Sequence, residues 1–404
     1  MTKRSQISTP TSAQLDSAAW IALLFFVASV QLSIAVSAIL LTVVLLLCVA
    51  KTTIAGEFPA VPSFFWPLVA YSAWTMVSVV YSPKPEISLI ESKEVLLFLV
   101  VPAVFQLSRG RRATILGTVI LTVGAITAVV GLVQYGILEY DNLGKRPLGS
   151  MGHYMTYSGL LMMVICLAVS RILFSAPDRV WATLVLPVLC VVLALTLTRS
   201  AWIGACIGVS VLFVLKVKFV LVQNDFRWLN RAPAAGAIIF AVAAIVVSLA
   251  PAQLTDRVLA TFDLQDPTNR DRFVMASIGA EMVRDHPVTG VGPEMVQERY
   301  ADYRPANAVN ATNPHLHNVP LQIAAERGLP GLVIWAWFIV MVTANLIRQL
   351  SSPPTRALAA AGLAAIASML SAGMFEYNFG DSEFLMMLLV LVTLPAAAAT
   401  TTTK

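Results

Sequence analysis

The chain has 404 residues, of which 58% are hydrophobic and only 12% are charged. A soluble domain carries about 25% charged residues, so this composition, with a mean hydropathy of +0.78, excludes an ordinary soluble protein. The formal charge of +5 implies no nucleic-acid partner, because basic residues at one rim of a membrane protein account for it.

Long apolar runs predict an all-α integral membrane protein with about twelve transmembrane helices. A helix rises about 1.5 Å per residue, so about 17–25 apolar residues cross a hydrocarbon core about 30 Å thick. The expected spans are residues 16–31, 33–50, 64–81, 94–108, 113–138, 154–174, 180–198, 201–222, 234–251, 330–347, 356–374 and 384–399. No small-residue cleavage site follows the first run, so we expect no removable signal peptide.

Basic residues divide the chain into two sides. Most lysines and arginines of the short loops fall on the cytoplasmic side if both chain ends lie inside, as positive charge is retained in the cytoplasm. We therefore expect spans one to nine in residues 1–251, a large external helical loop in 252–329, and spans ten to twelve in 330–404. The four cysteines lie within apolar spans without a CxxC pair, which predicts neither disulfides nor thiolate metal sites.

The external loop contains a predicted helix in "DPTNRDRFVMASIGAEMVRDHPVTGVG". Thr268 can cap it, with Asp271 three positions on, and apolar residues follow at helical spacing at Met275, Ile278 and Met282. Arg270 and Arg272 then fall in the first turn, where the helix dipole favours an anion. An anionic ligand would relieve that conflict, and solvated arginines paired with neighbouring acids are the alternative.

The stretch "HLHNVPLQIAAERGLPG" closes the loop with His315 and His317. Asn318 can cap a short helix, and Gly328 can end it before Pro330 starts the next span. His317 thus lies at a helix start near the membrane surface, where a histidine of unperturbed pKa about 6.5 can act as a general base. The alternative role is a hydrogen bond within the turn.

Several charged residues fall on the external side in this topology. They are Arg146, Arg199, Arg270, Arg272, His317 and the acids of "FEYNFGDSE". Arg199 stands between two apolar runs, where a charge is costly and usually functional. Arginines bind phosphates bidentately, and no His/Cys cluster or Asp-x-Asp pair indicates a metal, so the set suits a diphosphate held by protein alone. Glu376, Asp381 and Glu383 could orient an acceptor, but we expect a solvated loop there.

Three motifs resemble the bacterial O-antigen ligase family. "HN", nine residues, then "GLPG" resembles its His-[Asn/Ser/Gln]-x9-Gly-x-x-[Gly/Thr/Tyr] pattern at His317, Asn318, Gly328 and Gly331. "RFVMASIGAEMVRDHPVTGVG" is similar to the Arg…Pro-x-x-Gly-x-Gly element of the superfamily, at Arg272, Pro287, Gly290 and Gly292, and "TRSAW" to its junction carrying Arg199. Ala276 departs from the pattern, since many relatives have tryptophan there.

The resemblance implies a GT-C-like, metal-independent, inverting glycosyltransferase without a cofactor. It would move O-antigen from undecaprenyl diphosphate to a sugar hydroxyl of lipid A–core. The enzyme would lie in the bacterial inner membrane, in contact with membrane lipids, and its active site would face the periplasm. The implied roles are a general base at His317, diphosphate binding at Arg199 and Arg272, and further substrate contacts. Those contacts are Arg146, Arg270, His315 and Asn318, with Gly328 and Gly331 as structural motif residues.

Three alternatives stay open. An O-antigen polymerase and a protein O-oligosaccharyltransferase share these motifs. A lipid or polysaccharide transporter would fit the number of spans, but transporters place charges near the bilayer midplane within paired repeats, whereas these charges gather at one face.

Overall fold

The computed structural model describes residues 12–56, 60–138, 146–174, 176–223, 256, 259–260, 263, 265–306 and 308–400. Over this part of the chain the fold is helical throughout, with no strand. The first half contains α1 (Ser12–Ser29), α2 (Ile34–Ala55), α3 (Phe65–Val80), α4 (Pro85–Glu91), the 3-10 helix η1 (Ser92–Leu99), α5 (Val100–Leu107) and α6 (Arg111–Gly136). The remainder contains α7 (Tyr154–Leu173), α8 (Arg179–Leu195), α9 (Arg199–Gln223), α12 (Pro267–Asp285), α13 (Met295–Tyr303), α14 (Val319–Gln349), α15 (Pro353–Ala372), η3 (Asn378–Gly380) and α16 (Ser382–Ala399).

Seven of the described helices are long and apolar enough to cross a membrane: α2, α6, α7, α9, α14, α15 and α16. Helices α1, α3 and α8 are apolar but shorter. The expected span 234–251 lies outside the described residues, and the expected span 94–108 is η1 followed by α5 rather than one α-helix. An integral membrane protein with helical spans is therefore supported, and the number twelve stays a prediction.

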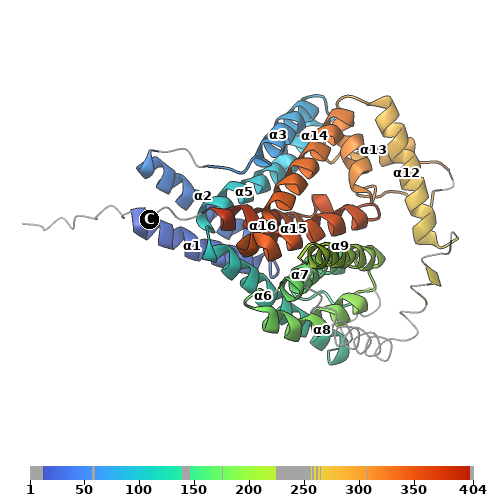
Figure 1. Ribbon diagram of the computed structural model, residues 1–404. Coiled ribbons are helices and arrows are strands. Elements are labelled where there is room, and N and C mark those ends of the chain that lie inside the picture. Colours follow the sequence, from blue (N-terminus) through green and yellow to red (C-terminus); the bar gives the residue numbers. More distant parts are fainter. Residues whose placement is uncertain are drawn as a thin grey trace, which may run out of the picture.

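Helices α7, α15 and α16 form the buried centre, and α9 packs closely against α15 (Figure 1). Small residues make that contact close: a Cβ at Gly204 would lie 3.0 Å from the Ser368 carbonyl oxygen, and one at Gly208 2.9 Å from that of Ala364. Small residues four positions apart allow such backbone approach between membrane helices. This packing fixes the start of α9, at Arg199, beside the end of α15.

Outside this centre, large apolar side chains point away from the protein. Examples are Ile39, Leu46, Val214, Val333 and Val340, each 64–69% exposed. Large contiguous exposed apolar surfaces mark membrane or partner contacts. We therefore take this surface as the lipid-facing side of α2, α9 and α14.

Helices α12 and α13 lie together at the edge of the molecule away from α1 and α2 (Figure 1). They have a core of their own, in which Met275, Ile278 and Met282 are at most 1% exposed, as their helical spacing predicts. Asp271 is buried beneath them and accepts hydrogen bonds from the side-chain amides of Asn310 (2.7 Å) and Asn313 (3.4 Å). The carboxylate thus ties the segment before His315 to α12.

Helix α14 is kinked at Gly328, whose φ of 69° and ψ of 179° lie in a region that is almost reserved for glycine. Pro330 lacks an N–H, so carbonyls of the preceding turn need other donors. The donors are Val291 N to Ala325 O (2.8 Å), Gly292 N to Glu326 O (3.0 Å) and Trp74 Nε1 to Arg327 O (2.8 Å). Helix α14 thus consists of two helical segments joined at Gly328, as expected for a short helix that ends there before Pro330 starts the next one, and the division of the chain at 251 and 329 stays a prediction.

The motif glycines explain how the 287–292 turn docks on this kink. A Cβ at Gly290 would lie 2.4 Å from the Glu326 oxygen, and one at Gly328 2.0 Å from the Val288 oxygen, so neither position accepts a side chain. Gly331 leaves room for Arg327 and Trp74. The backbone of the 287–292 turn, which follows α12, therefore lies directly against α14. This contact fixes the position of α12, which carries Arg272, relative to the start of α14, which follows His317.

Candidate functional site

A cavity of about 360 Å³ lies where the starts of α9, α12 and α14 meet the end of α15. All three residues expected to be catalytic line this cavity, together with Asn318; they are Arg199, Arg272 and His317. The other lining residues are Ser200, Ile203, Asn269, Phe273, Ala276, Leu316, Met374 and Phe375. Two arginines and one histidine thus share a mainly apolar cavity, although 118 positions of sequence separate the first from the last.

Backbone and capping contacts fix the loop that carries His317. Its φ is 48°, a left-handed conformation that histidine adopts more readily than most residues other than glycine. Asn318 caps α14, since its side-chain oxygen accepts from Leu321 N at 2.9 Å. On the other side, Val319 N donates to Gly373 O at 2.7 Å, which joins the loop to the end of α15.

Glu376 holds the imidazole of His317. The Nδ1 atom of His317 lies 3.0 Å from Oε2 of Glu376, and Tyr377 N donates to the other carboxylate oxygen at 3.2 Å. Burial raises the pKa of Glu376, but its hydrogen bond to His317 and the nearby charges, including Arg272, bring that pKa below its usual range. The ionised carboxylate can only accept, so in a neutral imidazole the hydrogen bond requires the proton on Nδ1 and the lone pair on Nε2.

The expectation of a solvated loop at Glu376 is wrong. Its side chain is only 14% exposed, and it belongs to the same cluster as His317. This pairing was not predicted, because a hydrogen bond across 59 positions depends on how α14 and α15 pack.

His315 lies beside His317 but does not line the cavity. The two rings are 4.2 Å apart in an edge-to-face arrangement. Burial, and next the charge of His317, lower the pKa of His315 to about 4, so this ring is neutral near pH 7. In this structure His315 contacts His317 rather than the cavity.

Arg199 is the first residue of α9 and is 9% exposed. It donates to Ala260 O at 2.9 Å, and its Nη2 lies 3.7 Å from an oxygen of Asp266. The Arg272 guanidinium lies 6.0 Å from the Phe375 ring on the same cavity. The two guanidinium groups are thereby oriented by protein contacts before any ligand arrives.

A second cavity of about 340 Å³ adjoins the first, and Arg199, Ser200 and Arg272 line both. Arg146 lines only the second, with its guanidinium 4.5 Å above the Tyr154 ring. The arginine set therefore extends over both cavities, with Arg199 and Arg272 at their junction.

Arg270 is not brought to either cavity. Pro267 is the first residue of α12, and the cap is Asp266, whose Oδ1 accepts from Thr268 N (3.0 Å) and Asn269 N (3.2 Å). The predicted cap at Thr268 is wrong, because proline is favoured at the first helical position and moves the cap one residue before it. With Asp266 as the cap, Arg270 is the fourth residue of α12 and Arg272 the sixth, so only Arg272 lies beyond the first turn, and Arg270 is exposed.

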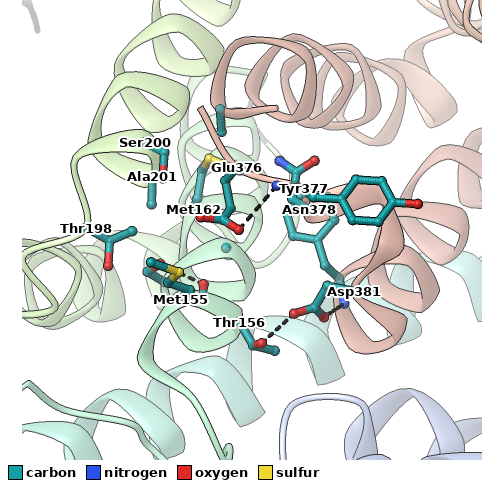
Figure 2. Close-up of a pocket in the computed structure, with 14 residues that line it drawn as sticks. Met155, Thr156, Met162, Thr198, Ser200, Ala201, Glu376, Tyr377, Asn378 and Asp381 are labelled. Carbon is teal, nitrogen blue, oxygen red and sulfur yellow. Dashed lines mark hydrogen bonds between the residues drawn. The ribbon is translucent and has the colours of Figure 1, made fainter. Parts of the chain in front are cut away.

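A small cavity of about 40 Å³ lies behind Glu376, between the start of α9 and the 376–381 turn, and has room for at least one water. Figure 2 shows Glu376 and Asp381 on the same side of this cavity, with Thr198 and Ser200 across from Glu376. Thr156 of α7 donates to Asp381, which also caps α16. These contacts fix the turn that carries Glu376 to α7 and α16.

One group of described side chains could hold a metal ion. Ligand atoms of His315, His317 and Glu376 all lie within 4.8 Å of one another. The sequence predicted no such cluster, since its third member lies far from the two histidines along the chain.

Comparison with known proteins finds a match to a family model. Residues 182–336 match the family model for O-antigen ligase. The matched range contains Arg199, Arg272 and His317, and it ends just after the kink of α14. No curated protein matches the chain.

Proposed function

We propose that this chain is a membrane glycosyltransferase with its active site in the cavity of Arg199, Arg272 and His317. The family match supports membership in the O-antigen ligase/polymerase superfamily, on which this proposal rests. Its donor is O-antigen on undecaprenyl diphosphate, and its acceptor is a sugar hydroxyl of lipid A–core. The observation that carries the proposal is the meeting of a histidine base and two arginines in one 360 Å³ cavity.

His317 is the general base in this proposal. With Nδ1–H donated to the Glu376 carboxylate, the neutral ring keeps a lone pair on Nε2, which takes the proton of the acceptor hydroxyl. The resulting imidazolium is stabilised by the same carboxylate. Glu376 does not take the proton itself, and it acts as a positioning residue.

Arg199 and Arg272 bind the donor diphosphate. The acceptor oxygen attacks the anomeric carbon while the bond from that carbon to the diphosphate oxygen breaks, so the configuration inverts. Charge develops on the leaving diphosphate, and guanidinium groups that are already oriented stabilise it without a metal ion. Arg146 continues the positive surface into the adjoining cavity, and Arg270, which is exposed, contributes at most a weak long-range attraction.

The apolar part of the cavity suits the carrier lipid. Ile203, Phe273 and Phe375 lie on the same cavity as the two arginines, and Phe273 is 64% exposed. A polyisoprenyl chain attached to a diphosphate requires this combination of apolar surface and adjacent positive charge.

The proposed topology places the cavity on the periplasmic side of the inner membrane. Helices α7, α15 and α16 each contribute a residue near one end, Met155, Ala372 and Phe384, to the small cavity behind Glu376, and their other ends lie near basic residues. Those basic residues are Arg109, Arg111, Arg112, Arg171, Arg179, Arg348 and Arg356. This asymmetry supports a cytoplasmic location for the opposite end. Twelve spans and a GT-C-like arrangement complete the proposal.

A transfer assay with defined substrates tests the function. The purified protein is incubated in EDTA with undecaprenyl-diphosphate-linked O-antigen and lipid A–core, and the products are separated by size. We expect O-antigen attached to lipid A–core. Longer carrier-bound chains with no modified lipid A–core would instead identify a polymerase, and no product from intact substrates would contradict both activities.

A further inference from the structure

The cluster of His315, His317 and Glu376 has the donor set of a transition-metal site. Two imidazole nitrogens and one carboxylate oxygen are the ligands that Zn²⁺ takes in many three-ligand protein sites. The three groups come from two segments that backbone hydrogen bonds join, Val319 N to Gly373 O among them. The cluster is therefore held by the fold and is not a chance approach of mobile side chains.

The distances are close to those of a zinc site. Bonds of about 2.0–2.2 Å place two ligands of a tetrahedral ion roughly 3.3 Å apart. His317 Nδ1 and Glu376 Oε2 are already 3.0 Å apart, and one ligand atom from each of the three residues lies within 4.8 Å of the other two. A change of about 1.5 Å in the position of the His315 ring, within the reach of side-chain rotation, completes three-point coordination.

One ring nitrogen of His315 makes no hydrogen bond within the described part of the chain. Its Nδ1 is buried and has no hydrogen-bond partner among the described residues. Buried polar atoms are nearly always satisfied, so an orphaned imidazole nitrogen next to a histidine–glutamate pair calls for an explanation. A bound cation beside the ring would supply one.

We propose that His315, His317 and Glu376 form a binding site for Zn²⁺ or a similar divalent transition-metal ion, and that the bound ion inhibits glycosyl transfer. Water takes the remaining coordination position. The site is not a cofactor site, because the ion occupies the group that the reaction needs free.

The inhibitory half rests on the proposed function. A neutral imidazole carries one proton, which lies on Nδ1 while Glu376 accepts it. When the ion takes Nδ1, that proton moves to Nε2, and Nε2 loses the lone pair that would accept the proton of the acceptor hydroxyl. The carboxylate stays ionised and changes from hydrogen-bond acceptor to metal ligand.

Calorimetric titration of ZnCl₂ into the full-length, chelator-treated protein in detergent tests the site itself. We expect one ion per chain and a loss of affinity of at least about tenfold in each of His315→Asn and Glu376→Gln. His286→Asn is the matched control, since His286 ends α12 and is not part of the cluster. Absence of binding in the unmodified protein, or unchanged affinity in both cluster variants, would overturn the proposal.

The transfer assay then tests inhibition. We expect stoichiometric Zn²⁺ to suppress product formation and EDTA to restore it, whereas Mg²⁺, which prefers oxygen ligands, has no effect. Full activity of the zinc-loaded protein would overturn the inhibitory role even if calorimetry finds the ion. The calorimetric result does not depend on turnover, so a failure of the proposed function is distinguishable from a failure of the metal site.

Discussion

The Nδ1 atom of His317 lies 3.0 Å from Oε2 of Glu376, although the two residues are 59 positions apart in the chain. This hydrogen bond selects the tautomer with a free Nε2 and connects the start of α14 to the turn after α15. The chemistry proposed for His317 depends on it.

Replacing Glu376 by glutamine should slow transfer without weakening substrate binding. An amide can keep the ring in place but does not stabilise the imidazolium, so we expect kcat to fall roughly 10–100-fold and KM to change less than about threefold. Steady-state kinetics of the purified variant measure both. Glu298→Gln on α13, at the exposed end of an ion pair with Lys84, is the matched control. A kcat equal to that of the control would remove Glu376 from the mechanism.

Arg199→Ala should reduce turnover roughly 10²–10³-fold, since it removes a preorganised guanidinium from the leaving diphosphate. Arg199→Lys should recover only part of this loss, because an ammonium keeps the charge but not the bidentate geometry. Arg199 also donates to Ala260 O, so thermal unfolding of both variants is measured beside activity. Full recovery by lysine would show that charge alone matters at this position.

Two arginines on α12 give an internal comparison. Arg272 lines both cavities, whereas Arg270 is exposed and lines neither. We expect Arg272→Ala to lower kcat/KM roughly 10–100-fold and Arg270→Ala to lower it less than about threefold. Arg284→Ala, at the other end of the same helix, controls for the loss of an exposed charge. Equal losses for Arg270 and Arg272 would contradict the cavity as the diphosphate site.

Gly328→Ala should lower the free energy of unfolding by at least about 1–3 kcal/mol. Its φ of 69° is strained for alanine, and the added Cβ would lie 2.0 Å from the Val288 oxygen. Gly136→Ala, at the end of α6 with no atom within 4 Å of the new Cβ, should be neutral or slightly stabilising. Thermal unfolding in detergent compares the two. A Gly328 variant as stable as the Gly136 variant would show that the kink tolerates a side chain.

The sequence predicted those features that depend on local pattern. Hydropathy predicted a helical membrane protein, the spacing of Met275, Ile278 and Met282 predicted a buried face, and Asn318 predicted a helix cap. Loop charge predicted that Arg199, Arg272 and His317 lie on one side, and the structure places them on one cavity.

The features that could not be predicted from the sequence depend on packing or on competing local signals. Glu376 reaches His317 only because α15 returns to the start of α14. The helix cap is Asp266 rather than the predicted Thr268, because Pro267 favours the first helical position. The docking of the 287–292 turn on the α14 kink is carried by glycines whose roles appear only when both backbones are placed.

The most direct test of the account is the turnover of His317→Asn in the defined transfer assay, measured together with its binding of the lipid-linked donor. Asparagine tolerates the left-handed backbone of this position, so the variant should fold and bind donor within about threefold of the unmodified protein. Because asparagine is not a base at neutral pH, turnover should fall roughly 10²–10⁴-fold. Turnover equal to that of the unmodified protein would contradict a general base at His317, and with it the proposed mechanism.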